Sequence, residues 1–316
     1  SSTRREHKYR QTQALPSVPT AVANFFNRAY YACGQSLVYS DVLVPLTRTN
    51  ATQVLTVGDT NNITALSGLP VQTTSSGVIQ ALMVFKASQV WQVTGDTAAS
   101  TLSLNFLSLT VGTYAPRSVA LSPLGLYFAS NSGPYIITQI GNMAPVTNGN
   151  NIVQDGEPDV LAPFQNAVTP SRIAGAYNNG IYRVCIDTII RGTQSTNDYW
   201  FHEKRRRWTG PHSFPYDCAS QYGNYFILCS NASTAALYKS QVVADTNTVY
   251  TELGVALTSM LQSATFPKTQ KMSEKQVVES TIELSSSGAA TSYAITAQDD
   301  QQNTIDNTMI AVSNTG

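Results

Sequence analysis

The strongest constraint on the fold is a strand–turn–strand unit that recurs along the chain at intervals of roughly 49 residues. Its clearest copy lies within residues 118–140. There, Gly125–Ala129 and Tyr135–Thr138 are runs of apolar, β-branched and aromatic residues, and the polar turn Asn131–Pro134 separates them. Such runs with Gly, Asn, Ser and Pro between them are typical of β-hairpins. The recurring unit therefore predicts an all-β fold.

The spacing of the unit predicts how its copies are arranged. Units of ~40–50 residues that contain several short strands are typical of β-propeller blades. We predict a β-propeller-like domain with five blades, or six if residues 45–76 form an irregular one. A β-sandwich with long loops is the alternative, because it too has strands every ~8–12 residues. The copies are centred on Tyr30, Val84, Tyr127, Tyr182 and Ile227.

Changes in composition predict three regions. Residues 1–20 form a basic N-terminal arm that includes Arg4 and Arg5, and residues 21–245 form the propeller-like domain. Residues 246–316 are predicted to form a β-sandwich-like region, in which Gln276–Leu284, Thr291–Thr296 and Met309–Val312 read as strands. Because the chain begins at Ser1, we expect it to be processed, renumbered or part of a longer protein.

The charge balance excludes a generally basic or acidic protein. Charged residues make up 12% of the chain, and the 19 basic and 19 acidic residues give a formal net charge of zero. Global charge therefore provides no attraction to nucleic acid or to an anionic membrane, although a local cluster can. No apolar stretch approaches the ~18 residues of a membrane-spanning helix, and the N-terminus lacks the apolar core of a secretory signal. We expect no membrane insertion.

Motifs of the common enzyme and metal-binding classes are missing from the sequence. It contains no nucleophile elbow, phosphate-binding loop or zinc-protease motif. The four cysteines and three histidines are too scattered for a zinc site, although Cys218 and Cys229 could face each other across one hairpin. The acidic stretch Asp155–Asp159 lacks the spacing of a calcium loop. We predict no catalytic residue, no metal and no cofactor.

One charged cluster interrupts this neutral sequence. Lys204, Arg205, Arg206 and Arg207 are consecutive, and Trp200 and Trp208 flank them. We predict a strand pair, Tyr199–His202 with Arg207–Trp208, joined by a cationic turn. The turn is either simply solvated, with an arginine stacked on a tryptophan, or a contact for phosphate or an acidic partner. The N-terminal Arg4 and Arg5 are further candidate contacts.

Four passages resemble the nozzle or tail-hub proteins of short-tailed bacteriophages, which include packaged-DNA stabilisation proteins and contain a β-propeller. Val90–Asp96 resembles a blade end, and the block from Pro116 to Tyr135 resembles a blade core. Asp198–Thr209 is similar to a strand pair that ends in a tryptophan. Leu261–Phe266, with the lysines that follow it, resembles the exit into a β-sandwich. The resemblance extends over roughly residues 80–285 through loose motifs.

The resemblance implies a structural protein of the virion tail that is assembled in the host cytoplasm and has no active site. Several copies, expected to be a hexamer, would form a ring below the portal-adaptor proteins and seat tail fibres or spikes. Double-stranded DNA would be retained in the channel and then pass through it, without sequence preference. Lys204–Arg207, Arg4 and Arg5 are the candidate DNA or partner contacts.

Two other functions stay open. A β-propeller that recognises host glycans would need pockets rich in aromatic, Asp and Asn residues. A propeller glycosidase would need two facing carboxylates, and the sequence alone does not show which carboxylates meet.

Overall fold

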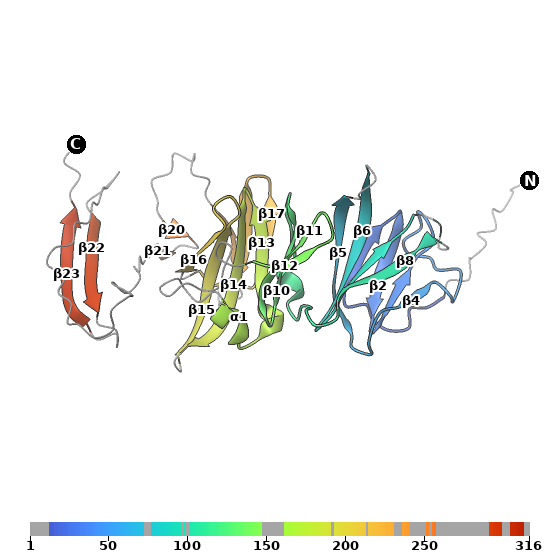
Figure 1. Cartoon of the computed structure of the whole chain (residues 1–316), viewed down its shortest axis with the longest axis horizontal. Helices are drawn as coiled ribbons and strands as arrows, with labels where there is room; N and C mark the ends of the chain where they lie inside the picture. Colours follow the sequence, from blue (N-terminus) through green and yellow to red (C-terminus); the bar gives the residue numbers. More distant parts are fainter. Residues whose placement is uncertain are drawn as a thin grey trace, which may run out of the picture. The chain divides into compact units, whose positions relative to one another are not determined.

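The computed structural model of the chain consists mainly of antiparallel β-strands (Figure 1). It describes residues 13–72, 77–96, 98, 101–146, 161–190, 193–212, 214–230 and 236–240, and the strands within 251–256, 291–298 and 304–312. The chain divides into two compact units. The first comprises residues 1–153, 158–243 and 251–259, and the second comprises residues 154–157, 244–250 and 260–316.

Strands β1 to β19 of the first unit form five antiparallel sheets, four with four strands and the last with three. The first sheet contains β1 (Val22–Phe25), β2 (Arg28–Cys33), β3 (Ser36–Tyr39) and β4 (Val54–Thr56). The second contains β5 (Ile63–Gln72), β6 (Val78–Lys86), β7 (Val90–Thr94) and β8 (Ser103–Ser108). The third contains β9 (Ala120–Leu121), β10 (Gly125–Ser130), β11 (Gly133–Thr138) and β12 (Met143–Pro145).

The fourth sheet contains β13 (Ala174–Asn178), β14 (Ile181–Ile190), β15 (Thr193–His202) and β16 (Arg207–His212). The fifth contains β17 (Cys218–Tyr222), β18 (Tyr225–Ser230) and β19 (Ala236–Lys239). Helical structure in the described residues comprises α1 (Leu161–Gln165), the 3₁₀ turns η2 (Pro116–Ser118) and η3 (Pro170–Arg172), and a 3₁₀ residue at Thr101. The all-β prediction is confirmed.

The predicted repeat corresponds to these sheets. The five centres lie in β2, β6, β10, β14 and β18, each of which is the second strand of its sheet. The sequence period therefore marks one sheet per repeat. Among the described residues no sheet closes on itself.

Each sheet packs against the next through its own apolar cluster. Tyr30 of the first sheet shares a cluster with Leu82 of the second, and Phe85 of the second shares one with Phe128 of the third. The next two clusters join the third sheet to the fourth and the fourth to the fifth. Stacked repeats that bury their faces against neighbours in this way are what propeller blades require. The propeller itself remains a prediction.

The other face of the first sheet is covered by the chain's own loops. Val38 and Cys33 of this face are 0% and 4% exposed, although neither belongs to the cluster shared with the second sheet. Residues 13–20 cover part of it, because the Cys33 thiol contacts the Ser17 carbonyl at 3.4 Å. The loop after β3 covers another part, where the Tyr31 hydroxyl donates to the Pro45 carbonyl. This end of the series needs no further sheet to bury it.

One prediction about the strands was wrong. Residues 45–76 show little periodicity. The short strand that the sequence predicts at Val54–Val57 is present as β4, but the ten-residue strand β5 was not predicted. Gly68 and Pro70 interrupt the apolar pattern of β5, which hid it. Pro70 is tolerated because β5 is the edge strand of its sheet, where a missing backbone N–H breaks no ladder on the open side.

The cysteines and the C-terminal strands follow the predictions where they are described. Cys218 and Cys229 are directly paired across β17 and β18, and both are free thiols. In the second unit, β22 (Thr291–Gln298) pairs with β23 (Thr304–Val312). The short strands β20 (Thr251–Glu252) and β21 (Val255–Ala256) pair with each other. The strand predicted at Gln276–Leu284 lies outside the described residues.

Candidate nucleic-acid interface

The cationic turn is an exposed connection between β15 and β16. Phe201 pairs with Trp208 and His202 with Arg207, so the strand pairing stops at the turn as predicted. Lys204, Arg205, Arg206 and Arg207 are all exposed. Arg206 has a φ of 50°, a left-handed conformation that closes the turn at some conformational cost for a non-glycine residue.

Glu203, the residue before the cations, fixes the turn to neighbouring hairpins. Its backbone N–H donates to the Gly180 carbonyl at 2.8 Å. Its Oε1 accepts from the Tyr127 hydroxyl at 2.9 Å and the Ser122 hydroxyl at 3.2 Å, and its Oε2 accepts from the Tyr177 hydroxyl at 2.6 Å. Burial and the Glu203 carboxylate raise the pKa of both tyrosines, which keeps the two hydroxyls protonated as donors. The carboxylate is thus occupied by three hydroxyls.

Lys204, Arg205 and Arg206 form no ion pair with a carboxylate in the described part of the chain. The ion pairs found in the described part of the chain are Lys86–Asp59, Arg172–Asp217 and Arg183–Asp198. We predicted that an arginine of the turn could stack on a tryptophan. The ring of Trp200 instead faces Arg183, and the guanidinium carbon lies 4.8 Å from the ring centre. Trp208 is buried among Phe164, Tyr182 and Phe201.

The pKa of the His202 imidazole responds to the positive charge of the turn. Burial lowers the pKa of its imidazole, and the positive charge of Arg205 lowers it further. Replacing Arg205 with glutamine removes the second cause, so the His202 pKa should rise while staying below its ordinary value because burial remains. An NMR titration of the His202 ring measures this. An unchanged pKa in Arg205→Gln, with Arg172→Gln as the control, would show that Arg205 does not act on the imidazole.

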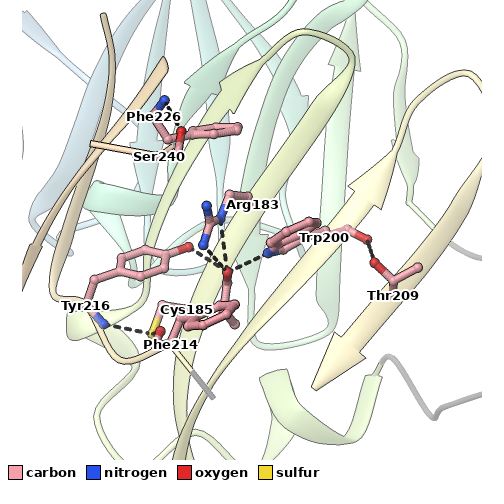
Figure 2. Close-up of polar contacts among 9 residues, drawn as sticks. Arg183, Cys185, Trp200, Thr209, Phe214, Tyr216, Phe226 and Ser240 are labelled. Atoms are coloured by element: carbon pink, nitrogen blue, oxygen red, sulfur yellow. Dashed lines mark hydrogen bonds and ion pairs between the residues drawn. The ribbon is translucent and has the colours of Figure 1, made fainter. Parts of the chain in front are cut away.

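The strand that carries the turn is held by a buried ion pair (Figure 2). Arg183 on β14 and Asp198 on β15 are 2% and 0% exposed. The Arg183 Nε and Nη2 donate to Asp198 Oδ2 at 3.0 and 2.5 Å. Trp200 Nε1 donates to the same oxygen at 2.5 Å, and the Tyr216 hydroxyl donates to Oδ1 at 2.8 Å. Burial raises the pKa of the Asp198 carboxyl, and the Arg183 charge opposes that rise.

Aromatic rings enclose the Arg183 guanidinium. The centres of the Trp200, Phe226, Tyr216 and Phe214 rings lie 4.8, 5.3, 5.7 and 6.0 Å from its central carbon. Cation–π attraction at such distances is strongest where water is excluded. Apart from Trp200, which is partly exposed, the residues of the cluster are buried. They join the fourth sheet to the fifth, so the cluster supports the fold rather than binding a ligand.

The sequence did not single out this cluster. Arg183 and Asp198 are 15 residues apart. Arg183 lies within an apolar run, and Asp198 lies between a polar stretch and the aromatic residues that follow it. The sequence feature that could have pointed to this cluster was a charge next to large apolar residues: Arg183 lies between Tyr182 and Val184, and Asp198 precedes Tyr199.

The remaining candidate residues of the sequence analysis lie outside the described residues. Arg4 and Arg5 lie outside the described residues, and so does the acidic stretch Asp155–Asp159. In the part of the chain that the structure describes, no group of three or more His, Cys, Asp or Glu side chains could hold a metal ion. Within the same residues, no helix is both long and apolar enough to span a membrane.

Comparison with known proteins adds little. No protein-family model matches the chain, and no curated protein is similar to it. Among solved structures, the AfRom2 CNH domain is similar with a TM-score of 0.41 and 8% sequence identity. That similarity covers 70% of this chain and 69% of the CNH domain. A likeness at this level indicates nothing about function.

Proposed function

We propose that this chain is a structural protein of a short-tailed phage tail, of the nozzle or tail-hub type, that contacts double-stranded DNA without reading its sequence. The observation that carries the DNA contact is the exposed turn Lys204–Arg206, whose charges have no carboxylate partner among the described residues. The assignment to a phage tail rests on the resemblance of the four passages in the sequence.

The chemistry of the turn suits a phosphate backbone. Lys presents a compact charge and Arg a planar fork of donors, and both bind phosphate oxygens. Such contacts position nucleic acid but carry no sequence information. The other partners belong to the same proposal: several copies of the chain in a ring, expected to be six, with portal-adaptor proteins above and tail fibres or spikes outside.

A salt titration of DNA binding tests the contact. Each neutralised phosphate contributes roughly 0.9 to the slope of log affinity against log salt concentration. The triple variant Lys204→Gln, Arg205→Gln and Arg206→Gln should therefore lower the slope by up to about 2.7 if all three side chains touch phosphates. Two duplexes of unrelated sequence should bind equally well to the unmodified chain.

The matched control is Arg172→Gln, because Arg172 is an exposed cation that already pairs with Asp217. Its salt slope should equal that of the unmodified chain. An equal loss in the control, or no loss in the triple variant, would contradict the DNA contact. Native mass spectrometry of the full chain tests the ring separately, and a strict monomer at every concentration would count against it.

A further inference from the structure

A polar depression lies where the ends of four first strands come together. Residues of β5, β9, β13 and β17, or of the turns beside them, line a hollow of about 540 Å³. This volume falls within the range of small-molecule sites, ~300–1,000 Å³. The residues that determine its chemistry are Leu121, Ser122, Gln139, Asn178, Asn179 and Gln221.

The amide side chains of the hollow offer both acceptors and donors. Gln139 Nε2 donates to the Pro123 carbonyl at 2.6 Å, and Asn179 Nδ2 donates to the Asn224 carbonyl at 3.4 Å. Gln221 Nε2 donates to the Gly223 carbonyl at 3.2 Å. Each amide nitrogen carries two hydrogens, so Gln139 and Asn179 each keep one N–H to donate, and the three amide oxygens have no partner among the described residues.

Asn178 adds a donor that the protein does not satisfy. It is 2% exposed and lines the hollow, and its Nδ2 has no hydrogen-bond partner in the described structure. Its Oδ1 accepts from Gln221 at 3.5 Å, which leaves the nitrogen as the free group. A buried unpaired donor costs ~1–3 kcal/mol, so a ligand that supplies an acceptor is favoured there.

The lining also selects against charge. No Asp, Glu, Lys, Arg or His side chain lines the hollow. Phosphates and carboxylates bring only acceptors, and no cationic side chain lines the hollow to pair with them. Hydroxyl groups both donate and accept, and they match amide oxygens that lie beside amide N–H groups. Leu121 and Pro123 supply apolar contacts of the kind that the C–H faces of a sugar ring use.

The rim of the hollow is fixed before any ligand arrives. Ser122 and Tyr177 line it, and both donate to Glu203. Asn179 and Gly180 form a tight turn with φ angles of 47° and 79°, which is typical of an Asn-Gly hairpin turn. A preformed rim lowers the conformational cost of binding.

We propose that this depression binds a neutral saccharide. It is separate from the DNA contact, since the proposed phosphate ligands Lys204, Arg205 and Arg206 do not line it. This site is the feature that favours glycan recognition among the alternative functions.

The test follows the side-chain amide signals of the full chain by NMR. The probes are glucose, galactose, mannose and N-acetylglucosamine, each added to millimolar concentration, with glucuronate as the charged counterpart. At least one neutral sugar should shift the Asn178 and Gln221 amide signals, and glucuronate should bind more weakly. Gln221→Leu, at an exposed position, should weaken binding by roughly three- to tenfold, the range for one neutral hydrogen bond.

Gln194→Leu is the matched control, because Gln194 is an exposed strand glutamine away from the hollow. It should leave sugar binding unchanged. Gln139→Leu provides a second variant of the lining. The proposal is overturned if none of the four sugars moves the two signals, if sodium or calcium chloride alone moves them instead, or if both lining variants bind sugar as the control does.

Discussion

Replacing Asp198 with alanine is expected to lower the free energy of unfolding by about 3–5 kcal/mol, the range for removing one partner of a buried ion pair. The change leaves the Arg183 guanidinium, which is 2% exposed, without its carboxylate. Trp200 and Tyr216 lose their acceptor as well. Urea unfolding of the full chain, followed by tryptophan fluorescence, measures the loss.

Two comparisons separate this effect from a general loss of charge. Asp217→Ala removes the partner of Arg172, which is 46% exposed, and should cost at most ~1 kcal/mol. The double variant Arg183→Met with Asp198→Leu leaves no buried charge and should be more stable than Asp198→Ala. If Asp198→Ala costs no more than Asp217→Ala, the buried cluster does not hold the fourth and fifth sheets together.

Replacing Glu203 with alanine is expected to cost on the order of 3 kcal/mol, because hydrogen bonds to a charged group contribute ~1.5–3 kcal/mol each and Glu203 is partly exposed. Tyr127 and Tyr177 would lose their acceptor, and their hydroxyls lie among stacked rings whose centres are 6.0 Å apart. The cationic turn would lose its connection to the neighbouring hairpins. Urea unfolding gives the cost, and hydrogen exchange of the residue-203 amide, which donates to Gly180, reports the loosened turn.

The single variants Tyr127→Phe and Tyr177→Phe divide this effect. Each removes one hydroxyl and keeps the ring, so each should cost less than Glu203→Ala. If Glu203→Ala unfolds at the same urea concentration as the unmodified chain and its amide exchanges no faster, the carboxylate does not fix the turn.

The sequence allowed much of the fold to be predicted, because one repeat corresponds to one sheet. Tyr30 and Val84 identified second strands, whose neighbours on both sides produce the clearest apolar runs. First strands are edge strands and tolerate residues such as Pro70, so β5 was missed. Strand pairing within a hairpin, as at Cys218 and Cys229, was also accessible because it depends on local turns.

The candidate sites were less predictable, because they depend on which sheets meet. The cationic turn was visible as four consecutive charges, and the structure exposes it as expected. The pairing of Arg183 with Asp198 depends on the register of two long strands. The amide-lined hollow depends on Gln139 and Gln221 being brought together from different sheets. Neither arrangement leaves a local pattern in the sequence.

The loops that cover the first sheet bear on how copies of this chain could meet. Residues 13–20 and the loop after β3 are joined to each other, since the Gln13 amide donates to the Arg48 carbonyl at 2.8 Å and Arg48 Nη2 donates to the Ala14 carbonyl at 2.7 Å. Any neighbour that approaches this face therefore touches loop surface, including Leu46 at 89% exposure, and not strand faces. Substitutions in these loops can therefore alter which surface this face contacts without changing the buried residues of the sheets.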